Sequence, residues 1–201
     1  MKKITLYFIL LICLIGLCGC NDNNKNDNTS SDAERTSYST TSPSPTPTKE
    51  IEKSTFTTNI LDKTPNRLDN IALTCSKINE ITVKSGETFS FCDTVGKVSS
   101  NTGYKEADVL DAKGKPFKGF GGGNCQVSST LYNAVLGFKD LQVLERHSHS
   151  KKVYYVEKDK DAAIDSNSKL DFKFKNTTGH DIKIYASSTD KNVTVTLKSL
   201  E

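Results

Sequence analysis

The sequence has little net charge and no apolar run of membrane-spanning length. Its 27 basic residues exceed its 24 acidic residues by three, and by only one without Lys2 and Lys3. Such a balance gives no electrostatic attraction to a polyanion, so we expect no nucleic-acid partner. The apolar run at residues 4–17 is shorter than the about 20 residues that a membrane-spanning helix needs. The scattered carboxylates also lack the pairing that glycoside cleavage requires.

The N-terminus has the layout of a secretory signal. Two lysines precede the apolar run, which ends in the sequence LCGC at residues 17–20. This ending resembles the lipobox of bacterial lipoproteins, which implies diacylglycerol on the Cys20 thiol and cleavage before it. We expect a signal peptide at 1–19 and an extracytoplasmic protein that acyl chains on Cys20 hold on the cell membrane. A signal cut elsewhere and an uncleaved anchor are the alternatives.

The segment after Cys20 is poor in apolar residues. Residues 21–54 are rich in Asn, Asp, Ser, Thr, Lys and Pro, so ordering them would cost conformational entropy with almost no burial to offset it. We predict a lipidated N-terminus and disordered linker at 20–55. Apolar periodicity begins near residue 56 and continues to the end, which predicts one domain at 56–201.

The periodicity predicts an α+β domain. Helical spacing of apolar residues predicts helices over 66–79 and from Cys125 onward, the second with Asn124 as its N-cap and Gly137 as its C-terminal stop. Alternating patterns predict a short hairpin within 96–120 and strands at 81–83, 88–91, 141–146, 152–156, 170–175, 181–187 and 192–198. We expect a mostly antiparallel sheet with one wet face, packed with two or more helices.

Cys125 is the strongest candidate for chemistry. It follows three glycines, Gly121, Gly122 and Gly123, and lies in the first turn of a predicted helix. The unpaired N–H groups and the dipole at a helix start favour an anion, so they favour the nucleophilic thiolate. Glycines allow unusual backbone angles and let a substrate chain pass close to the backbone. The same N–H groups could stabilise an oxyanion.

A base is available nearby in the sequence. The chain has only three histidines, and two of them, His147 and His149, follow a predicted strand. Residues two apart on a strand point the same way, so both could face one site. Asp161, Asp165 and Asp171 are candidates to orient the imidazole. A cysteine, a histidine and a carboxylate form a general arrangement for nucleophilic catalysis.

Other roles for these residues stay open. A cysteine at a helix start can be a small buried residue with no catalytic role. Cys125, His147 and His149 could supply three zinc ligands, although this spacing has low specificity; we expect no metal and no cofactor. Cys75 and Cys92 could form a disulfide or could both be small core residues.

The domain resembles the VanW family over roughly residues 60–198. The resemblance is carried by segments 86–91, 95–96, 103–107, 121–134, 145–150, 161–162 and 171–176. It implies a bacterial cell-envelope protein with nine residues at family motif positions: Gly121, Gly122, Gly123, Cys125, Gln126, Ser128, Ser129, His149 and Asp161. Cys92 stands where the family commonly has asparagine, which weakens a family-wide role for a bridge to Cys75. Residues 163–166 also depart from the family pattern, so specificity could differ.

We hypothesise a thiol-dependent enzyme that acts on peptidoglycan peptides by hydrolysis or acyl exchange. Cys125 would attack the carbonyl, His149 or His147 would take its proton, and Asp161 would orient the imidazole. The substrate and the oxyanion would be bound by Gly121, Gly122, Gly123, Gln126, Ser128, Ser129 and nearby N–H groups. A non-catalytic module that binds wall peptides or a partner envelope protein, and a membrane-tethered scaffold that positions other wall enzymes, are the alternatives.

Overall fold

The computed structural model describes residues 48–110, 113–165 and 169–201, which form an α+β domain. The predictions of a signal peptide, of lipidation on Cys20 and of a linker up to residue 47 lie outside the described residues. The elements in chain order are β1 (Glu50–Asn59), α1 (Pro65–Ile78), β2 (Thr82–Val83), β3 (Thr88–Ser90), α2 (Phe91–Val95), η1 (Ser100–Thr102), β4 (Glu106–Leu110), β5 (Pro116–Phe120), α3 (Asn124–Leu136), β6 (Leu141–Glu145), β7 (Lys173–Asn176), β8 (Asp181–Ser188) and β9 (Asn192–Leu200).

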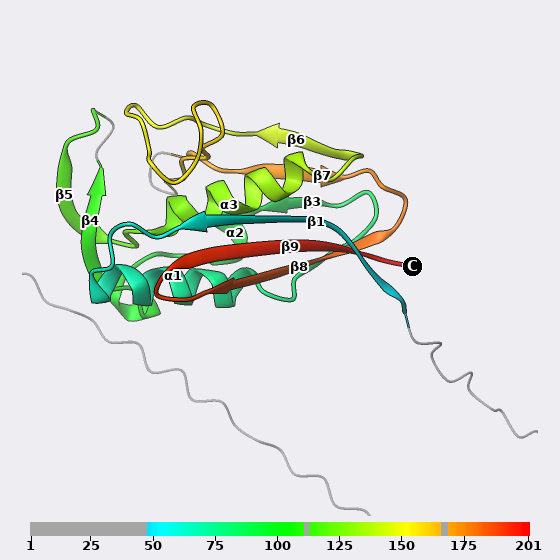
Figure 1. The fold of residues 1–201 in the computed structure, drawn as a ribbon, viewed down its shortest axis with the longest axis horizontal. Helices are drawn as coiled ribbons and strands as arrows, with labels where there is room; N and C mark the ends of the chain where they lie inside the picture. Colours follow the sequence, from blue (N-terminus) through cyan, green and yellow to red (C-terminus); the bar gives the residue numbers. More distant parts are fainter. Residues whose placement is uncertain (1–47, 111–112, 166–168) are drawn as a thin grey trace, which may run out of the picture. The chain divides into compact units, whose positions relative to one another are not determined.

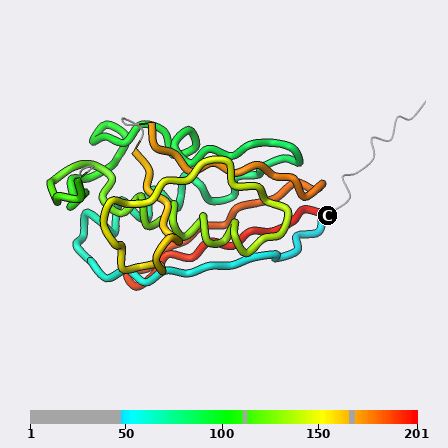
Figure 2. Tube along the Cα trace, turned by 90° about the horizontal axis from the view of Figure 1, so that it is seen from above, coloured from blue at the N-terminus to red at the C-terminus, as the bar shows by residue number. Residues whose placement is uncertain are grey.

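The largest sheet has four antiparallel strands in the order β1-β9-β8-β2. Glu50 pairs with Leu200, so the start of β1 and the C-terminus lie side by side (Figure 2). β1 begins at Glu50, which corrects the domain start that we expected near residue 56. Its first residues are mostly exposed and polar, so hydrophobic periodicity could not reveal a strand that is held at its start by backbone pairing to β9.

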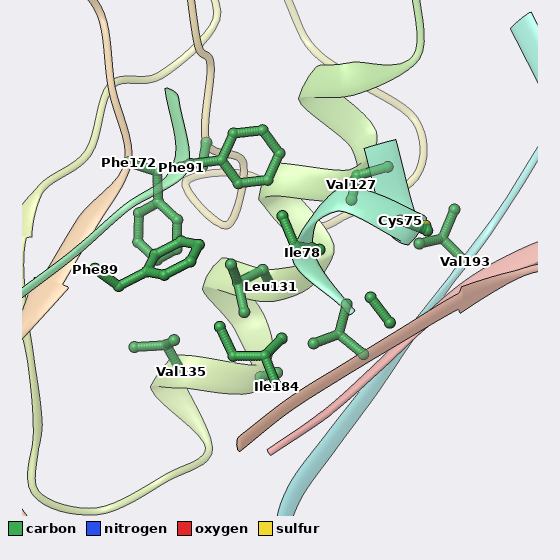
Figure 3. Close-up of a cluster of buried hydrophobic side chains, with 14 of the residues drawn as sticks. Cys75, Ile78, Phe89, Phe91, Val127, Leu131, Val135, Phe172, Ile184 and Val193 are labelled. Carbon is green, nitrogen blue, oxygen red and sulfur yellow. The ribbon is translucent and has the colours of Figure 1, made fainter. Parts of the chain in front are cut away.

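Helix α3 packs between this sheet and a second antiparallel sheet of order β3-β7-β6 (Figure 1). α1 packs against α3 and against β8. Apolar residues from the helices and both sheets form one core, with Leu131 of α3 near its centre (Figure 3). Phe89 stacks on Phe174 with ring centroids 5.1 Å apart. The core therefore fixes α3, and with it the residues at the start of that helix.

The structure agrees with one further prediction from the sequence and differs from two. The short hairpin within 96–120 is confirmed as β4 and β5, which pair with each other in a sheet of their own. The strand expected at 152–156 was wrong, because this segment has no strand partner. Gly123, and not Asn124, is the N-cap of α3; the Asn124 side chain instead accepts a hydrogen bond from Thr74 Oγ1 at 2.7 Å.

Among the described residues, no helix combines the length and the apolar character of a membrane span.

Candidate functional site

The three glycines bring the chain to the start of α3 in a conformation that other residues would not tolerate. Gly121 and Gly123 have φ values of +80° and +110°, in the region that favours glycine. At Gly122 there is no room for a side chain, because a Cβ would lie 2.7 Å from the Asp108 carbonyl oxygen and 2.8 Å from Ala107 Cβ. The glycines therefore let β4 pack directly against the turn that precedes Cys125.

Cys125 is partly exposed and lines a pocket of about 630 Å³, called here the Cys125 pocket. The start of α3 and the three glycines form its floor, and the β4–β5 hairpin contributes the aromatic side chains of Phe117 and Phe120. His149 and the following segment, including Tyr154 and Tyr155, also line it. The thiol is thus reachable from solvent and does not lie in a dry apolar core.

The structure brings Cys125, His149 and Asp161 together. Cys125 and His149 line the same pocket and interact electrostatically, and His149 Nδ1 lies 2.6 Å from Asp161 Oδ2. Because Nδ1 faces the carboxylate, Nε2 is the ring nitrogen left for the thiol. Cys125 Sγ also lies 3.6 Å from the Ile164 carbonyl oxygen. A thiol, an imidazole and a carboxylate in this order have the connectivity of a catalytic triad.

The charged forms of His149 and Asp161 stabilise each other. Burial acts to lower the pKa of His149, but hydrogen bonding to Cys125 and then to Asp161 outweighs it, so the pKa is raised above its ordinary value. Burial acts to raise the pKa of Asp161, but hydrogen bonds from the backbone and the ring of His149 outweigh it, so the pKa is lowered. The site therefore favours an imidazolium beside an ionised carboxylate.

Arg146 completes the support of Asp161. Its Nη2 donates to Asp161 Oδ1 at 2.8 Å, and its Nε donates to the Asp161 carbonyl oxygen at 2.6 Å. The guanidinium also lies over the ring of Tyr132, 5.5 Å from its centroid. The carboxylate is thus held in one orientation by charged groups on both of its oxygens. Our sequence reasoning gave Arg146 no role, although it lies in the motif that contains both histidines.

Ser128 and Ser129 lie beneath the site and do not line the pocket. Ser129 Oγ donates to the Cys125 carbonyl oxygen at 2.7 Å and accepts from the Ala162 N–H at 2.9 Å. Ser128 Oγ donates to the Ala162 carbonyl oxygen. In this structure the two serines fasten α3 to the segment that carries Asp161, which corrects their expected contact with substrate.

Gln126 lines the pocket, but its amide is already engaged. Its Nε2 donates to Thr58 Oγ1 at 3.1 Å and to the Asn59 carbonyl oxygen at 3.0 Å, and its Oε1 accepts from Arg67 Nη2 at 3.0 Å. The side chain therefore ties α3 to β1 and α1 in place of donating freely to an oxyanion. The backbone N–H of Cys125 is the better candidate for that role, because the N–H groups of Asn124 and Gln126 already donate to the Gly121 and Gly123 carbonyl oxygens.

His147 does not join the other candidates. Its Nε2 lies 2.9 Å from Glu145 Oε1, and its backbone forms an isolated bridge with Ala163. β6 ends at Glu145, so the strand alternation that would align the two histidines is lost before His149. Asp171, another candidate acid, accepts from Ser90 Oγ at 2.6 Å and from the Cys92 N–H at 2.9 Å.

Tyr155 and Arg67 also lie at the pocket, and our sequence reasoning missed both. Burial, followed by the electrostatic effect of Cys125, raises the pKa of the Tyr155 phenol. Arg67 reaches the pocket from α1, far away in the sequence. Only the fold brings these residues to Cys125, so local spacing contains no signal for them.

Cys75 and Cys92, the other cysteines among the described residues, are free thiols, and the described residues show no metal cluster. Cys75 and Cys92 do not form the disulfide that was left open. Burial raises the pKa of Cys75 to about 12, while Cys92 lines the Cys125 pocket. Within the described parts of the chain, no three His, Cys, Asp or Glu side chains are grouped to hold a metal ion. Cys125, His147 and His149 are therefore not assembled as the ligand set that we considered.

Comparisons with known proteins agree with the motif resemblance. The family model described as VanW like protein matches residues 66–198. The chain is similar to the uncharacterized protein YoaR of Bacillus subtilis, with 39% identity over 144 residues, which are 72% of this chain and 46% of that protein. It is also similar to the vancomycin B-type resistance protein VanW of Enterococcus faecalis, with 31% identity over 133 residues, which are 64% of this chain and 47% of that protein. The chain thus spans about half the length of these curated relatives. No solved structure matches.

Proposed function

The chain belongs to the VanW-like protein family, and on that premise we propose that it is a cysteine-dependent acyl-transfer enzyme of the bacterial cell envelope. The observation that carries the proposal is that Cys125 and His149 line one pocket, with Asp161 paired to His149 Nδ1 at 2.6 Å. The substrate class that fits is a peptide, because a thiol nucleophile with an imidazole base is suited to attack on an amide carbonyl.

In the proposed reaction, His149 Nε2 takes the thiol proton as Cys125 Sγ attacks the carbonyl carbon. The tetrahedral intermediate collapses when the C–N bond breaks, and His149 returns the proton to the leaving amine. A thioester on Cys125 results. Water then releases an acid, or a second amine releases a new amide, and either attack restores the thiol. Asp161 orients the ring and stabilises the imidazolium that forms between the two proton transfers.

The oxyanion of the intermediate would lie at the start of α3. The backbone N–H of Cys125 and the helix dipole favour negative charge at this point. Tyr155 is a second candidate donor, because its raised pKa keeps the phenol protonated and its side chain lies near Cys125. Neither donor depends on the side chain of Gln126, which is engaged elsewhere.

We place this reaction outside the cytoplasmic membrane. The proposed lipid on Cys20 would anchor the chain, and the polar, proline-containing segment after it would extend the domain toward the cell wall. Wall peptides are the candidate substrates there, and the relative named for vancomycin B-type resistance supports a task related to the wall. A pocket that binds such peptides without cleaving them is the alternative, and the aromatic residues of the β4–β5 hairpin would suit binding.

Alkylation of Cys125 tests the chemistry directly. The folded protein is treated with iodoacetamide at pH 6, and the rate at each cysteine is followed by mass spectrometry. We expect Cys125 to react at least about tenfold faster than the same residue in urea-unfolded protein, because His149 accepts its proton. His149→Gln should remove the acceleration, whereas His147→Gln should keep it. An equal rate in folded and unfolded protein would leave the non-catalytic binding function.

A further inference from the structure

Arg67 lines the Cys125 pocket with an incompletely paired guanidinium. Its Nη2 donates to Gln126 Oε1 at 3.0 Å, but its Nε is buried and has no hydrogen-bond partner among the described residues. The nearest carboxylate oxygen, Asp62 Oδ2, lies 3.9 Å from Nε, which is too far for a hydrogen bond. The Asp62 side chain also accepts a hydrogen bond from the Thr64 N–H at 3.0 Å.

A buried guanidinium N–H without an acceptor is costly, because its interaction with water is lost and nothing replaces it. The group that best satisfies such a fork is a carboxylate, which accepts two parallel N–H donors. Asp108 also lies at the pocket, but its Oδ1 is paired with Lys118 Nζ at 2.8 Å. Arg67 is therefore suited to receive an acceptor that a ligand brings.

The position of Arg67 limits where that acceptor lies. Arg67 bonds to Gln126, and Gln126 follows Cys125 directly on α3. Arg67, Cys125 and Tyr155 all line this one pocket. A carboxylate bound by Arg67 would thus share one pocket with a carbonyl held at Cys125 Sγ.

We propose that Arg67 forms an anionic subsite, so that the substrates of the Cys125 pocket are peptides with a free carboxylate close to the reacting carbonyl. The inference about the acyl donor rests on the proposed function, whereas carboxylate binding by Arg67 does not. Asp62 competes with the ligand for Arg67 and is displaced from it when the carboxylate binds.

Protection of Cys125 from iodoacetamide measures this subsite. N-acetyl-alanyl-alanine, in its L and D forms, is the carboxylate probe, and the corresponding C-terminal amides are the matched neutral probes. In the wild-type chain we expect one acid form to halve the alkylation rate at a concentration about tenfold lower than its amide, the gain of one charge-assisted pairing. Arg67→Gln should abolish the difference between acid and amide, and Arg67→Lys should restore only part of it, because lysine lacks the fork.

Asp62→Asn supplies an independent arm that leaves Arg67 in place. The amide oxygen can still accept from the Thr64 N–H, but the competing charge is gone, so the preference for the acid should increase. Equal protection by acid and amide in the wild-type chain, no protection by either, or an unchanged preference in Arg67→Gln would each overturn the subsite. The alkylation rate without any probe reports the proposed function separately, so its failure is distinguishable from failure of the subsite.

Discussion

Asp161 Oδ2 accepts two hydrogen bonds from His149, one from the backbone N–H and one from ring Nδ1, each at 2.6 Å. One oxygen thus fixes both the path of the main chain and the plane of the ring. The other carboxylate oxygen is held by Arg146, so the acid cannot turn away. This double contact makes the orientation of the imidazole a property of the fold, present before any substrate arrives.

Removal of this carboxylate should destabilise the protein strongly. In Asp161→Ala, Arg146 and His149 lose their common partner in a place where their side chains are only 21% and 12% exposed. Breaking such a pair costs about 3–5 kcal/mol. Urea unfolding measures the loss, with Asp69→Ala as control, because the ion pair of Asp69 with Lys105 is exposed and should be worth about 0–1 kcal/mol. Equal losses in the two variants would contradict the special position of Asp161.

The stability of the protein should also depend on pH through the ionisation of His149 and Asp161. The folded-state pKa of His149 is raised, so its contribution is fully present below its unfolded value of 6.5 and is lost as the pH rises through the folded value. The pKa of Asp161 is lowered, so its contribution is present above its unfolded value of 3.8 and is lost as the pH falls further. The pair therefore adds most between these two unfolded values.

His149→Gln isolates this dependence. The difference in unfolding free energy between wild type and variant should be largest between about pH 4 and pH 6.5, and it should shrink toward pH 9. Urea unfolding at a series of pH values gives the difference directly. His147→Gln is the control, because its partner Glu145 belongs to a separate pair on β6. A difference that grows above pH 7 would show that the sign of the linkage is opposite.

Gly122→Ala should separate β4 from the start of α3. The new Cβ would lie 2.7 Å from the Asp108 carbonyl oxygen, and this backbone atom cannot move like the end of a flexible side chain. We expect a loss of about 1–3 kcal/mol, typical of overpacking, and slower alkylation of Cys125. Gly179→Ala is the matched control, since φ there is +85° but nothing lies within 4 Å. It should show only backbone strain of about 1–2 kcal/mol, with the Cys125 rate unchanged.

The sequence predicted the elements that alternate cleanly and missed those held by pairing or tertiary contact. In β9, the alternation of Val193, Val195 and Leu197 matches their burial on one face. β1 instead contains pairs such as Thr55 with Thr196, whose hydroxyl oxygens lie 2.8 Å apart. Such polar pairs look like linker sequence until the partner strand is known. The segment 152–156 shows the converse, because it alternates in sequence but lines the Cys125 pocket without pairing as a strand.

For the site, the local sequence predicted the nucleophile and the base, but not the residues that hold them in place or line the pocket beside them. Cys125 after glycines and His149 in a histidine motif were recognisable from their immediate neighbours. Asp161 was one of three acids that spacing could not separate; the family resemblance singled it out, and the fold places its carboxylate on His149 Nδ1. Arg67 could not be found at all, because α1 meets the start of α3 through packing. Residues that act through long-range contacts leave no local pattern.

Ser129 should couple the stability of the site to its reactivity. Ser129→Ala removes the acceptor of the buried Ala162 N–H and the donor to the Cys125 carbonyl oxygen, which should cost about 1–3 kcal/mol. Since Asp161 is covalently next to Ala162, a shift of this segment should also move the carboxylate from His149 and slow the alkylation of Cys125 at pH 6. Urea unfolding and the alkylation rate together measure both effects.

Ser128→Ala is the neighbouring control for this coupling. Ser128 Oγ donates to the Ala162 carbonyl oxygen, and Ser129 Oγ lies within 3.5 Å of the same oxygen. Loss of one donor therefore leaves that carbonyl a partner, whereas loss of Ser129 leaves the Ala162 N–H with none among the described residues. We expect Ser128→Ala to cost less and to keep most of the Cys125 reactivity. If the two variants lose stability and reactivity equally, the Ala162 N–H is not the link between α3 and Asp161.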